Sequence, residues 1–428
     1  MKKKYRIILY TSIFLLCVVA SIILVVKKSN SVYEEESKPK VVKHKSMLSM
    51  NLEQTAGSGD YKTVTQSSWP TEGYKFNAEL SKCENGSTLS WDDTKKAVIM
   101  QGNVSDKCYV YFDKILTLAE YVISQYTGTQ GDNALYYHNS TLTNGAGDNS
   151  YRYAGANPNN FVCFGSDASP CPIDNLYRII GVFGENYHGA NGKQLVKLIK
   201  YDYMTTDELG TDGDYSQTYK EWGMDNTYKG TYGDGERIGV YYWNYKATGS
   251  ATNTWSTSLL NKTNLNTNFI NNIGTTWANK IATVTWKVGG NTWANIGTKT
   301  SSVAYTNEIT NPVTTNTTDN ATTYSAKIGL MYVSDYGFAA SPDAWTLTMS
   351  SYNNTTATNN NWMYMGLYEW TISRTADYSN YAFYVHYDGY VNYNYVDYRS
   401  GVRASFNLES SVSYVSGSGS MSDPIVIN

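Results

Sequence analysis

The sequence is poor in the residues on which most catalytic motifs depend. Its 428 residues include only 5 cysteines and 4 histidines (His44, His138, His188 and His386). Neither an HExxH nor a G-x-S-x-G motif is present, so nothing points to a zinc protease or a serine hydrolase. No two cysteines have the CxxC spacing of a redox site. Carboxylates are present, as in almost any domain, and without geometry they do not identify a glycosidase.

Charge is also scarce. Charged residues make up 17% of the chain, and the formal net charge is −3. Proteins that bind nucleic acid neutralise phosphates with clusters of lysine and arginine, and no such excess exists here. The composition therefore gives no reason to expect a nucleic-acid partner.

Tyrosine, in contrast, is abundant, with 40 copies. An A+T-rich coding sequence would raise tyrosine and asparagine throughout the chain. A binding surface would raise tyrosine locally, because the side chain combines a large rigid contact area with a hydrogen-bonding tip. Both explanations stay open for the overall tyrosine content. The second would account for places where tyrosines cluster.

The N-terminus contains the longest apolar run, at residues 7–26, with four cations before it and Lys27-Lys28 after it. Twenty residues in a helix span roughly 30 Å, the thickness of a bilayer core. No small-x-small cleavage site precedes Lys27. We therefore expect residues 1–28 to be an uncleaved signal anchor in the cell membrane. The charge bias predicts a single-pass protein whose C-terminal bulk is extracellular.

Residues 29–60 have mixed charge and little periodicity, which is typical of a flexible stalk. Residues 61–114 contain short strand-like runs separated by turn residues, which predicts a small β domain. Cys83 and Cys108 bracket this unit. Exported chains meet oxidising conditions, so we expect these two cysteines to form a disulfide.

Residues 115–175 are expected to form a helix and loop connector. Apolar residues recur with helical spacing over 115–126, and Gly128 suits the end of this helix. Cys163 and Cys171 are expected to form a second disulfide. Gly-Asp-Asn occurs at Gly131 and Gly147, but neither copy lies in the spaced series of oxygen ligands that calcium requires. We expect surface turns there and no cofactor, and the sequence leaves metal binding undetermined.

A large C-terminal domain is expected over residues 176–428. Strands are predicted at LYRIIGVF (176–183) and QLVKLIKYDY (194–203). Ser256 and Asn264 are expected to cap two short helices, with Gly274 ending the second. A helical turn is expected after Ser334.

The most distinctive stretch is 373–427, in which eight tyrosines fall between Tyr378 and Tyr398. Asp388-Gly389 lies between two runs rich in aromatic and β-branched residues, and this predicts a β-hairpin. In a strand, Phe383, Val385 and Tyr387 share one face, and Tyr384, His386 and Asp388 share the other.

We expect the first face of this strand to be core and the second to be displayed. Tyr384, His386, Tyr393 and Tyr395 are expected to point outward and to carry most of the contact energy with a ligand. The alternative is ordinary packing, since half-buried sheets favour tyrosine. The candidate ligand-binding residues are Tyr378, Tyr381, Tyr384, His386, Asp388, Tyr390, Tyr393, Tyr395 and Tyr398.

The order of the motifs LYRIIGVF, W-x-x-S-x-L, KIGLMYVSDYG, EWTISR, YVHYDGYV and GVRASFNL resembles a broad family of uncharacterised bacterial surface domains. The resemblance covers roughly residues 175–428, and Ala404 stands where the family usually has proline. It implies an α+β fold similar to C-type lectins and to the formylglycine-generating enzyme. That enzyme uses cysteines late in the domain, and this chain has none after Cys171, so its activity is not expected.

The positions that resemble the hallmarks of the family are Trp370, Arg374, Gly389, Gly401 and Arg403. One reading gives these residues structural roles, in which the tryptophan fills the core and the arginines bind carbonyls or a carboxylate. The other reading places them in direct contact with a ligand. We favour the structural reading.

The sequence thus predicts a membrane-tethered extracellular binding protein that recognises a glycan or protein ligand through its tyrosine-rich hairpin. Two alternatives remain open. The first is an enzyme that acts on cell-wall glycans, although no motif favours catalysis. The second is a structural surface protein that associates with itself through its tyrosines.

Overall fold

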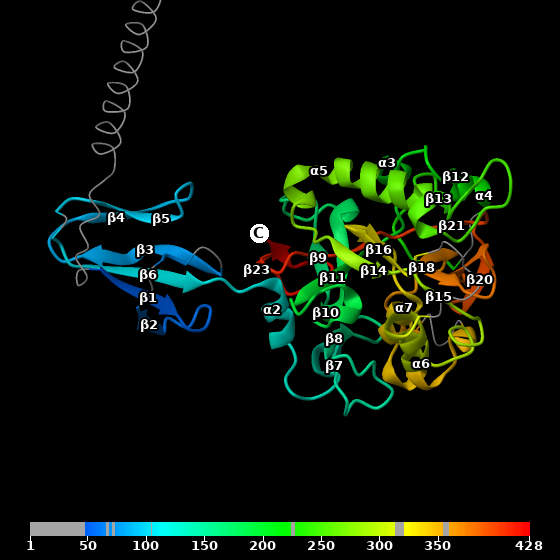
Figure 1. Ribbon diagram of the computed structural model, residues 1–428, viewed down its shortest axis with the longest axis horizontal. Helices are drawn as coiled ribbons and strands as arrows, with labels where there is room; N and C mark the ends of the chain where they lie inside the picture. The colour runs from blue at the N-terminus through cyan, green and yellow to red at the C-terminus, as the bar shows by residue number, and fades with distance from the viewer. Residues whose placement is uncertain are drawn as a thin grey trace, which may run out of the picture. The chain divides into compact units, whose positions relative to one another are not determined.

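The computed structural model describes residues 48–65, 68–70, 73–103, 105–223, 227–312, 321–353 and 359–428. Within these ranges no helix is long and apolar enough to cross a membrane. The predicted anchor, residues 1–28, lies outside the described residues. The chain divides into a small unit, Met1–Lys114, and a large unit, Ile115–Asn428. Both are shown in Figure 1, and the expected end of the small β domain at residue 114 coincides with this division.

The small unit is a β structure. Strands β1 (Leu48–Glu53), β2 (Tyr61–Val64), β3 (Tyr74–Cys83) and β6 (Cys108–Lys114) form a sheet of order β2-β1-β6-β3. A separate hairpin consists of β4 (Thr88–Asp92) and β5 (Ala97–Gln101). The prediction of a flexible stalk over residues 29–60 is wrong for its C-terminal part, because β1 begins at residue 48.

Burial along β6 alternates, with Cys108, Val110 and Phe112 inside, as expected for a strand with one covered face. Phe112 is packed by the rings of Trp69 and Trp91. Cys83 and Cys108 face each other across β3 and β6 and form the predicted disulfide. Closing this loop contributes roughly 3 kcal/mol in the chain-entropy account, a useful addition for a unit with a small core.

The described residues of the large unit form a seven-stranded sheet of order β17-β22-β11-β10-β8-β7, with β9 also paired to β10. The strands are β7 (Leu135–His138), β8 (Ser150–Tyr153), β9 (Phe161–Cys163), β10 (Leu176–Phe183), β11 (Leu195–Lys200), β17 (Ile328–Gly329) and β22 (Ser405–Asn407). Both long strands were predicted, β10 with the same bounds. Every residue of β10 is buried, as in a strand covered on both faces.

The expected connector, residues 115–175, is part of the large unit. Its helix α2 (Leu118–Ser124) is confirmed and carries a capping box between Thr117 and Glu120. Strands β7, β8 and β9, however, join the sheet that contains β10. The Cys163–Cys171 disulfide is confirmed and closes the loop before β10.

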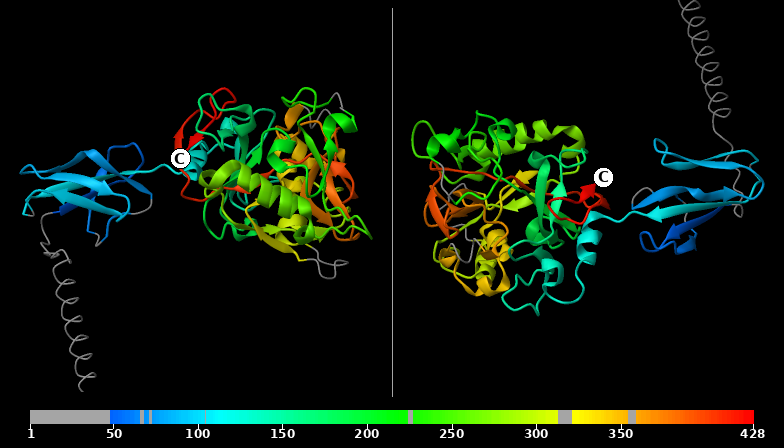
Figure 2. Two further views of the ribbon diagram at one scale, coloured as in Figure 1. Left: turned by 90° about the horizontal axis from the view of Figure 1, so that it is seen from above. Right: turned by 180° about the vertical axis from the view of Figure 1, so that it is seen from behind.

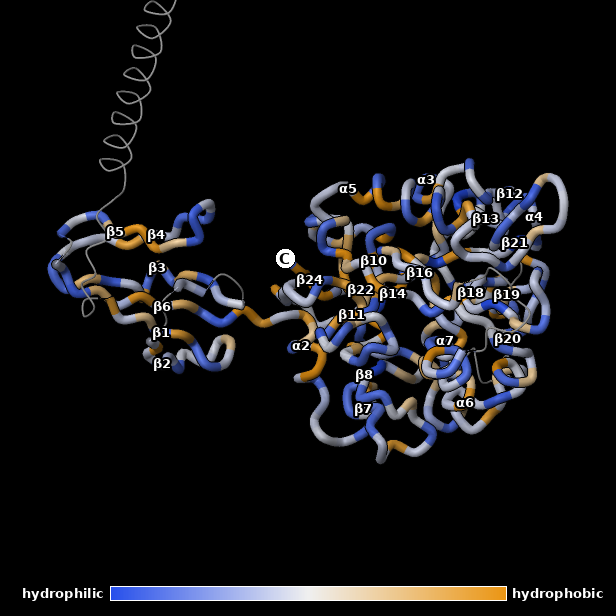
Figure 3. Tube along the Cα trace, viewed as in Figure 1, coloured by the Kyte–Doolittle hydropathy of each residue, from blue (hydrophilic) through white to orange (hydrophobic). Residues whose placement is uncertain are grey.

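The C-terminal strands β23 (Tyr414–Ser416) and β24 (Val426–Ile427) lie beside α2 in both Figure 1 and Figure 2. The backbone of Leu118 donates a hydrogen bond to Val412, and Tyr414 donates one to Leu116. In Figure 3 the hydrophobic colour gathers along α2 and along the central strands of the large unit, where the main core lies. The hydrogen bonds of Leu118 and Tyr414 thus join the N-terminal helix of the large unit to its C-terminal strands.

Helices and smaller sheets cover this core. The helices are α3 (Thr206–Leu209), α4 (Tyr219–Trp222), the π-helix η5 (Leu260–Phe269), α5 (Ile270–Ala278), α6 (Ser301–Tyr305) and α7 (Val333–Ala339). One smaller sheet contains β12 (Tyr215–Thr218), β13 (Gly239–Tyr242) and β21 (Arg399–Ser400). A second pairs β14 (Val284–Lys287) with β16 (Thr323–Ala326). A third contains β15 (Gly290–Asn291), β18 (Glu369–Thr375), β19 (Tyr381–Val385) and β20 (Val391–Tyr395).

Two of the expected helix caps are wrong. The hydroxyl of Ser258, not of Ser256, accepts the backbone N–H of Asn261 at the start of the helix. Asn264 is buried inside η5 and donates to the carbonyls of Leu209 and Asp212. Gly274 has a left-handed φ of 75° and separates two helical segments within α5, so the expected helix end at this glycine is confirmed. The helical turn after Ser334 is confirmed as α7.

Candidate functional site

The predicted hairpin is present as β19 and β20. These strands pair antiparallel, with Val385 opposite Val391 and Tyr381 opposite Tyr395. Gly389 has a φ of 94°, and its N–H binds the carbonyl of His386. A left-handed residue closing a turn in this way requires glycine, as the Asp-Gly signal implied. The hydroxyl of Tyr336 on α7 donates to the carbonyl of Gly389 at 2.6 Å, which anchors the turn to the core.

The predicted core face of β19 is confirmed for Phe383 and Val385, which are 0% and 2% exposed. The predicted display of Tyr384 and His386 is wrong, because they are only 6% and 8% exposed. A second layer covers that face: Tyr384 packs against Trp370 and Tyr368.

The four residues expected to point outward also do not share a face. Tyr393 lies opposite Phe383, and Tyr384 lies opposite Asn392. Directly opposed residues in a sheet project to the same side. Tyr393 and Tyr395 therefore share the face of Phe383, whereas Tyr384 lies on the reverse face.

An exposed group of aromatic rings does exist, at the open end of the hairpin. It consists of Tyr378, Tyr381, Tyr393 and Tyr395, and we call it the tyrosine cluster. The Tyr381 ring centroid lies 4.4 Å from that of Tyr395 and 5.2 Å from those of Tyr378 and Tyr393. Tyr378 is 51% exposed and Tyr395 is 49% exposed. The hydrogen bond that Tyr381 donates to Tyr395, together with burial, raises the pKa of Tyr381 to about 12.

The base of the tyrosine cluster is rigid. Trp293 packs against Tyr393 and stacks on Phe383, with centroids 5.3 Å and 6.3 Å apart. Asn253 also fixes the segment before β19, since its side-chain amide donates to the carbonyls of Tyr378 and Tyr381 at 2.9 Å and 2.8 Å. The exposed rings therefore stand on a backbone that is already ordered.

The remaining aromatic candidates belong to a second, half-buried group around His386, which we call the histidine cluster. Tyr390 stacks on the His386 ring at 4.2 Å, and the Tyr368 hydroxyl lies 3.2 Å from His386 Nε2. Because the N–H of Asp388 donates to Nδ1 at 3.1 Å, we assign the ring proton to Nε2. Burial raises the pKa of Tyr368 and Tyr390, so their hydroxyls stay protonated. The members are Trp222, Tyr368, Tyr384, His386, Tyr387, Tyr390 and Tyr398.

The hallmark positions have structural roles. Trp370 is fully buried and donates through Nε1 to the carbonyl of Tyr241. Arg374 is also buried and donates through Nε to the carbonyl of Val288. A Cβ on Gly401 would lie 2.7 Å from the Tyr203 ring, so only glycine fits there.

Arg403 is the most heavily engaged hallmark. Its Nε lies 2.8 Å from a carboxylate oxygen of Glu369, and both side chains are at most 2% exposed. It also donates to the carbonyls of Met363 and Tyr201. Burial raises the pKa of Glu369 although Arg403 lies beside it. The guanidinium thus joins three segments of the chain inside the protein.

The pattern of the sequence did not reveal a buried ionic network. Arg152 on β8 binds Asp148 at 2.6 Å, and Lys197 on β11 binds Asp335 on α7 at 2.5 Å. His188 lies 2.9 Å from Asp148. Burial opposes charge on Asp148, but Arg152 holds its pKa well below the usual range. All five side chains are at most 4% exposed, so the network ties β8, β11 and α7 together without reaching solvent.

Glu308 lies near this network, and burial raises its pKa to about 7. It accepts the backbone N–H groups of Val333 and Ser334 at the start of α7, each at 2.9 Å, and the hydroxyl of Ser373. An acid at a helix N-terminus satisfies donors that the helix leaves unpaired. This is a cap and not an exposed catalytic acid.

In the two Gly-Asp-Asn turns, both aspartates bind other side chains of the protein. Asp148 is engaged by Arg152, and Asp132 accepts a hydrogen bond from Thr127. Among the described residues, no three His, Cys, Asp or Glu side chains are placed to hold a metal ion.

No protein-family model matches this chain, and no curated protein or solved structure does either. The resemblance to bacterial surface domains stays a prediction from the motifs.

Proposed function

We infer that this protein is a membrane-anchored, outward-facing binding protein and that its tyrosine cluster holds a glycan or protein ligand. The observation that carries this inference is the solvent exposure of Tyr378 and Tyr395 at the end of a hairpin whose other end is buried. Large aromatic side chains are normally covered in a folded protein, and a group of them on the surface marks an interaction site.

Tyrosine on a rigid base is well suited to recognition. Its ring offers contact area with two rotatable side-chain bonds, so ordering it costs little entropy. Here the rings already touch one another, and Trp293 and Asn253 hold their backbone. Exposed aromatic rings that carry hydroxyl groups can stack on a sugar ring or receive an apolar side chain. The histidine cluster, which is half-buried, supports the reverse side of the hairpin.

The N-terminal sequence and the cysteines both support a location outside the cytoplasm. An apolar run with flanking lysines predicts the anchor. The disulfides Cys83–Cys108 and Cys163–Cys171 suit an oxidising compartment outside the cytoplasm. The lectin-like fold belongs to the same proposal. It is supported by the order of the sequence motifs and by the α+β composition of the large unit.

The test uses the full chain in nanodiscs, applied to an array of glycans and to immobilised extracellular proteins. We expect the Tyr378→Ser/Tyr395→Ser variant to lose at least about 30-fold in affinity for whatever the native chain binds, since one aromatic anchor carries about 2 kcal/mol. Tyr187→Ser is the matched control, because Tyr187 is 42% exposed and lies in the short helix Asn186–His188, outside the hairpin. Unchanged binding by the double variant would move the ligand site away from the hairpin.

The two alternatives give different results in the same preparation. A wall-acting enzyme would convert a bound glycan into shorter products, which chromatography of the incubated sugar would reveal. A self-associating surface protein would form larger species as its concentration rises, and the Tyr378→Ser/Tyr395→Ser variant would not. Either result would replace the binding proposal.

A further inference from the structure

A second candidate site lies away from the tyrosine cluster, where two hollows of the large unit share a wall. The first has a volume of about 180 Å³ and the second about 300 Å³. Asn157 and Asn159, in the loop between β8 and β9, line both. The C-terminal loop also borders both, through Ser418 in the first hollow and Ser420 in the second. We call the two hollows together the loop groove.

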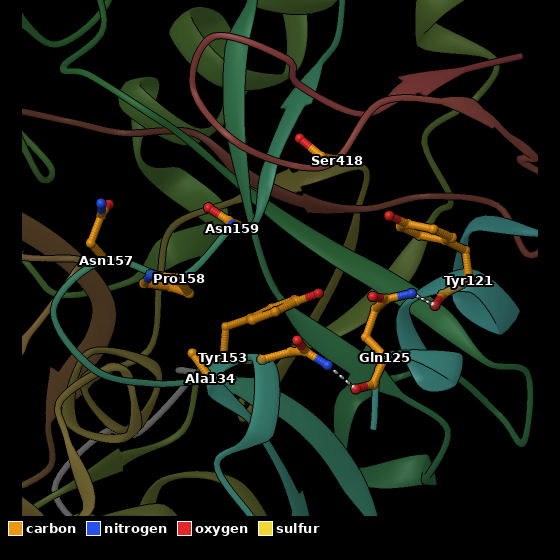
Figure 4. A pocket seen from close by; sticks show the side chains of 9 residues that line it. Tyr121, Gln125, Ala134, Tyr153, Asn157, Pro158, Asn159 and Ser418 are labelled. Carbon is orange, nitrogen blue, oxygen red and sulfur yellow. Dashed lines mark hydrogen bonds between the residues drawn. The ribbon is translucent and has the colours of Figure 1, made fainter. Parts of the chain in front are cut away.

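The first hollow is polar but uncharged. Figure 4 shows the side chains that surround it, which come from α2, from the segment before β7, from the β8–β9 loop and from the C-terminal loop. They offer amide and hydroxyl groups that both donate and accept hydrogen bonds. The lining residues are Tyr121, Gln125, Asn133, Ala134, Tyr153, Asn157, Pro158, Asn159 and Ser418.

Tyr153 gives the first hollow a hydroxyl group that has no hydrogen-bond partner among the described residues. Its ring is buried, with 3% of the residue exposed, whereas its hydroxyl oxygen keeps contact with solvent. The hydroxyl end faces the opening in Figure 4. A hydroxyl that opens into a hollow and has no partner in the protein can both donate a hydrogen bond to a ligand and accept one from it. A ligand with a hydroxyl or carbonyl group would complete this residue.

The second hollow has aromatic walls. The guanidinium of Arg178 lies between the rings of Phe161 and Trp362, 4.4 Å and 4.6 Å from their centroids. Tyr201 and Tyr364 line the same space. Phe161, Trp362 and Tyr364 are nearly buried, so Tyr201, which is partly exposed, offers the apolar ring surface beside the asparagines.

The shared wall is held in place before any ligand arrives. Arg178 donates through Nη2 to the carbonyl of Pro158 and through Nε to the side-chain oxygen of Asn160. The amide of Asn160 donates to the carbonyl of Ile179 on β10. Asn157 and Asn159, in contrast, are exposed, and no described residue binds their side-chain amides. A fixed backbone with uncommitted amides is what a preorganised binding site requires.

The groups that line the two hollows restrict the kind of ligand that can bind there. An apolar ligand would leave the amides and the Tyr153 hydroxyl unpaired. A small multivalent anion would find no cation in the first hollow, and the two cations of the second, Arg178 and Lys229, lie over aromatic rings. A sugar presents hydroxyls at its rim and an apolar face of C–H groups, which match amides and aromatic rings respectively. We propose that the loop groove binds an oligosaccharide, with one sugar ring in each hollow and Asn157 and Asn159 between them.

The test titrates the full chain in nanodiscs with chitotetraose, cellotetraose, xylotetraose and maltotetraose by calorimetry. At least one of them binds if the proposal is correct. Tyr153→Phe keeps the ring and removes only the hydroxyl, and we expect it to weaken that sugar by about 3- to 10-fold, the equivalent of one hydrogen bond. We expect Asn157→Ala/Asn159→Ala to weaken it by more than about 10-fold. Asn271→Ala, an exposed asparagine on α5, is the matched control and leaves the affinity unchanged.

The proposal is overturned if none of the four sugars binds. It is also overturned if a sugar binds equally well to Asn157→Ala/Asn159→Ala and to the native chain. Binding that disappears in Tyr378→Ser/Tyr395→Ser but persists in the groove variants places the sugar on the tyrosine cluster instead. Thermal unfolding of Tyr153→Phe shows whether its fold is intact, so a loss of binding is not confused with a loss of structure.

Discussion

Removing Arg403 should leave a buried carboxylate without its counter-charge. In the native protein, Glu369 and Arg403 are each at most 2% exposed and are 2.8 Å apart. Breaking such a pair from one side typically costs about 3–5 kcal/mol, because the remaining ion is still out of water. We therefore expect the Arg403→Met variant to be less stable than the native protein by that amount at pH 7.5.

The loss of stability in Arg403→Met should depend on pH. The direction of this dependence follows from the protonation of Glu369. Without Arg403, burial raises the folded-state pKa of Glu369 far above its unfolded value of about 4.3. Proton binding then favours the folded state. The stability that it contributes is fully present below the unfolded pKa and is lost as pH rises through the folded pKa. Protonating this carboxyl costs about 4 kcal/mol at pH 7.5 and about 1 kcal/mol at pH 5.

The deficit of Arg403→Met relative to the native protein should therefore shrink by up to about 3 kcal/mol when the pH falls from 7.5 to 5. Urea unfolding followed by tryptophan fluorescence measures the free energy of unfolding at each pH. The matched control is Arg403→Met/Glu369→Gln, which mimics the protonated acid and should show no such pH dependence. A deficit that is equal at both pH values, or a control that behaves like the single variant, would refute the reasoning.

Two further predictions follow from the structure and from the sequence. Gly401→Ala should destabilise the large unit by about 1–3 kcal/mol, because the new Cβ would lie 2.7 Å from the Tyr203 ring; a melting temperature unchanged from the native protein would contradict this. Residues 29–428 should be removed by protease added to intact cells whose wall has been stripped, since the charge bias around the apolar run places them outside. Full protection of the chain would show the opposite orientation.

The sequence predicted the local features of the hairpin because local chemistry determines them. Asp388-Gly389 specifies a turn, and alternating Phe383 and Val385 specify a buried face. It could not show that Tyr384 is covered, because the covering ring of Tyr368 comes from a separate segment, just before β18. Alternation identifies one buried face, and a strand covered on both faces gives no separate signal.

The boundary expected at residue 175 failed for a related reason. Strands β7, β8 and β9 have only 4, 4 and 3 residues, too short for a clear periodicity. Their place in the sheet depends on pairing with β10 and with each other. The ionic network has the same origin, because folding brings Lys197 and Asp335 from distant segments to the Asp148–Arg152 pair. No spacing in the sequence could have revealed it.

The hallmark arginines show where sequence reasoning succeeded. Arg374 and Arg403 were expected to bind carbonyls or a carboxylate, and they do. Arginine adjacent to apolar strands is rarely free, since burying an unpaired cation is unfavourable. The loop groove could not be predicted, because it combines α2, the β8–β9 loop and the last residues of the chain.

The order of strands in the small unit determines how that unit bears mechanical load. The chain enters through β1 and leaves through β6, and these two strands are parallel neighbours, with Leu48 opposite Cys108 and Leu52 opposite Phe112. Pulling on the two ends of the unit therefore slides β1 along β6, so all the hydrogen bonds between them resist together rather than opening one after another. If the pair does part, the Cys83–Cys108 bond keeps the residues between those cysteines from being drawn out. A surface protein held at one end and bound at the other would thus gain a spacer that resists tension and lengthens little when it yields.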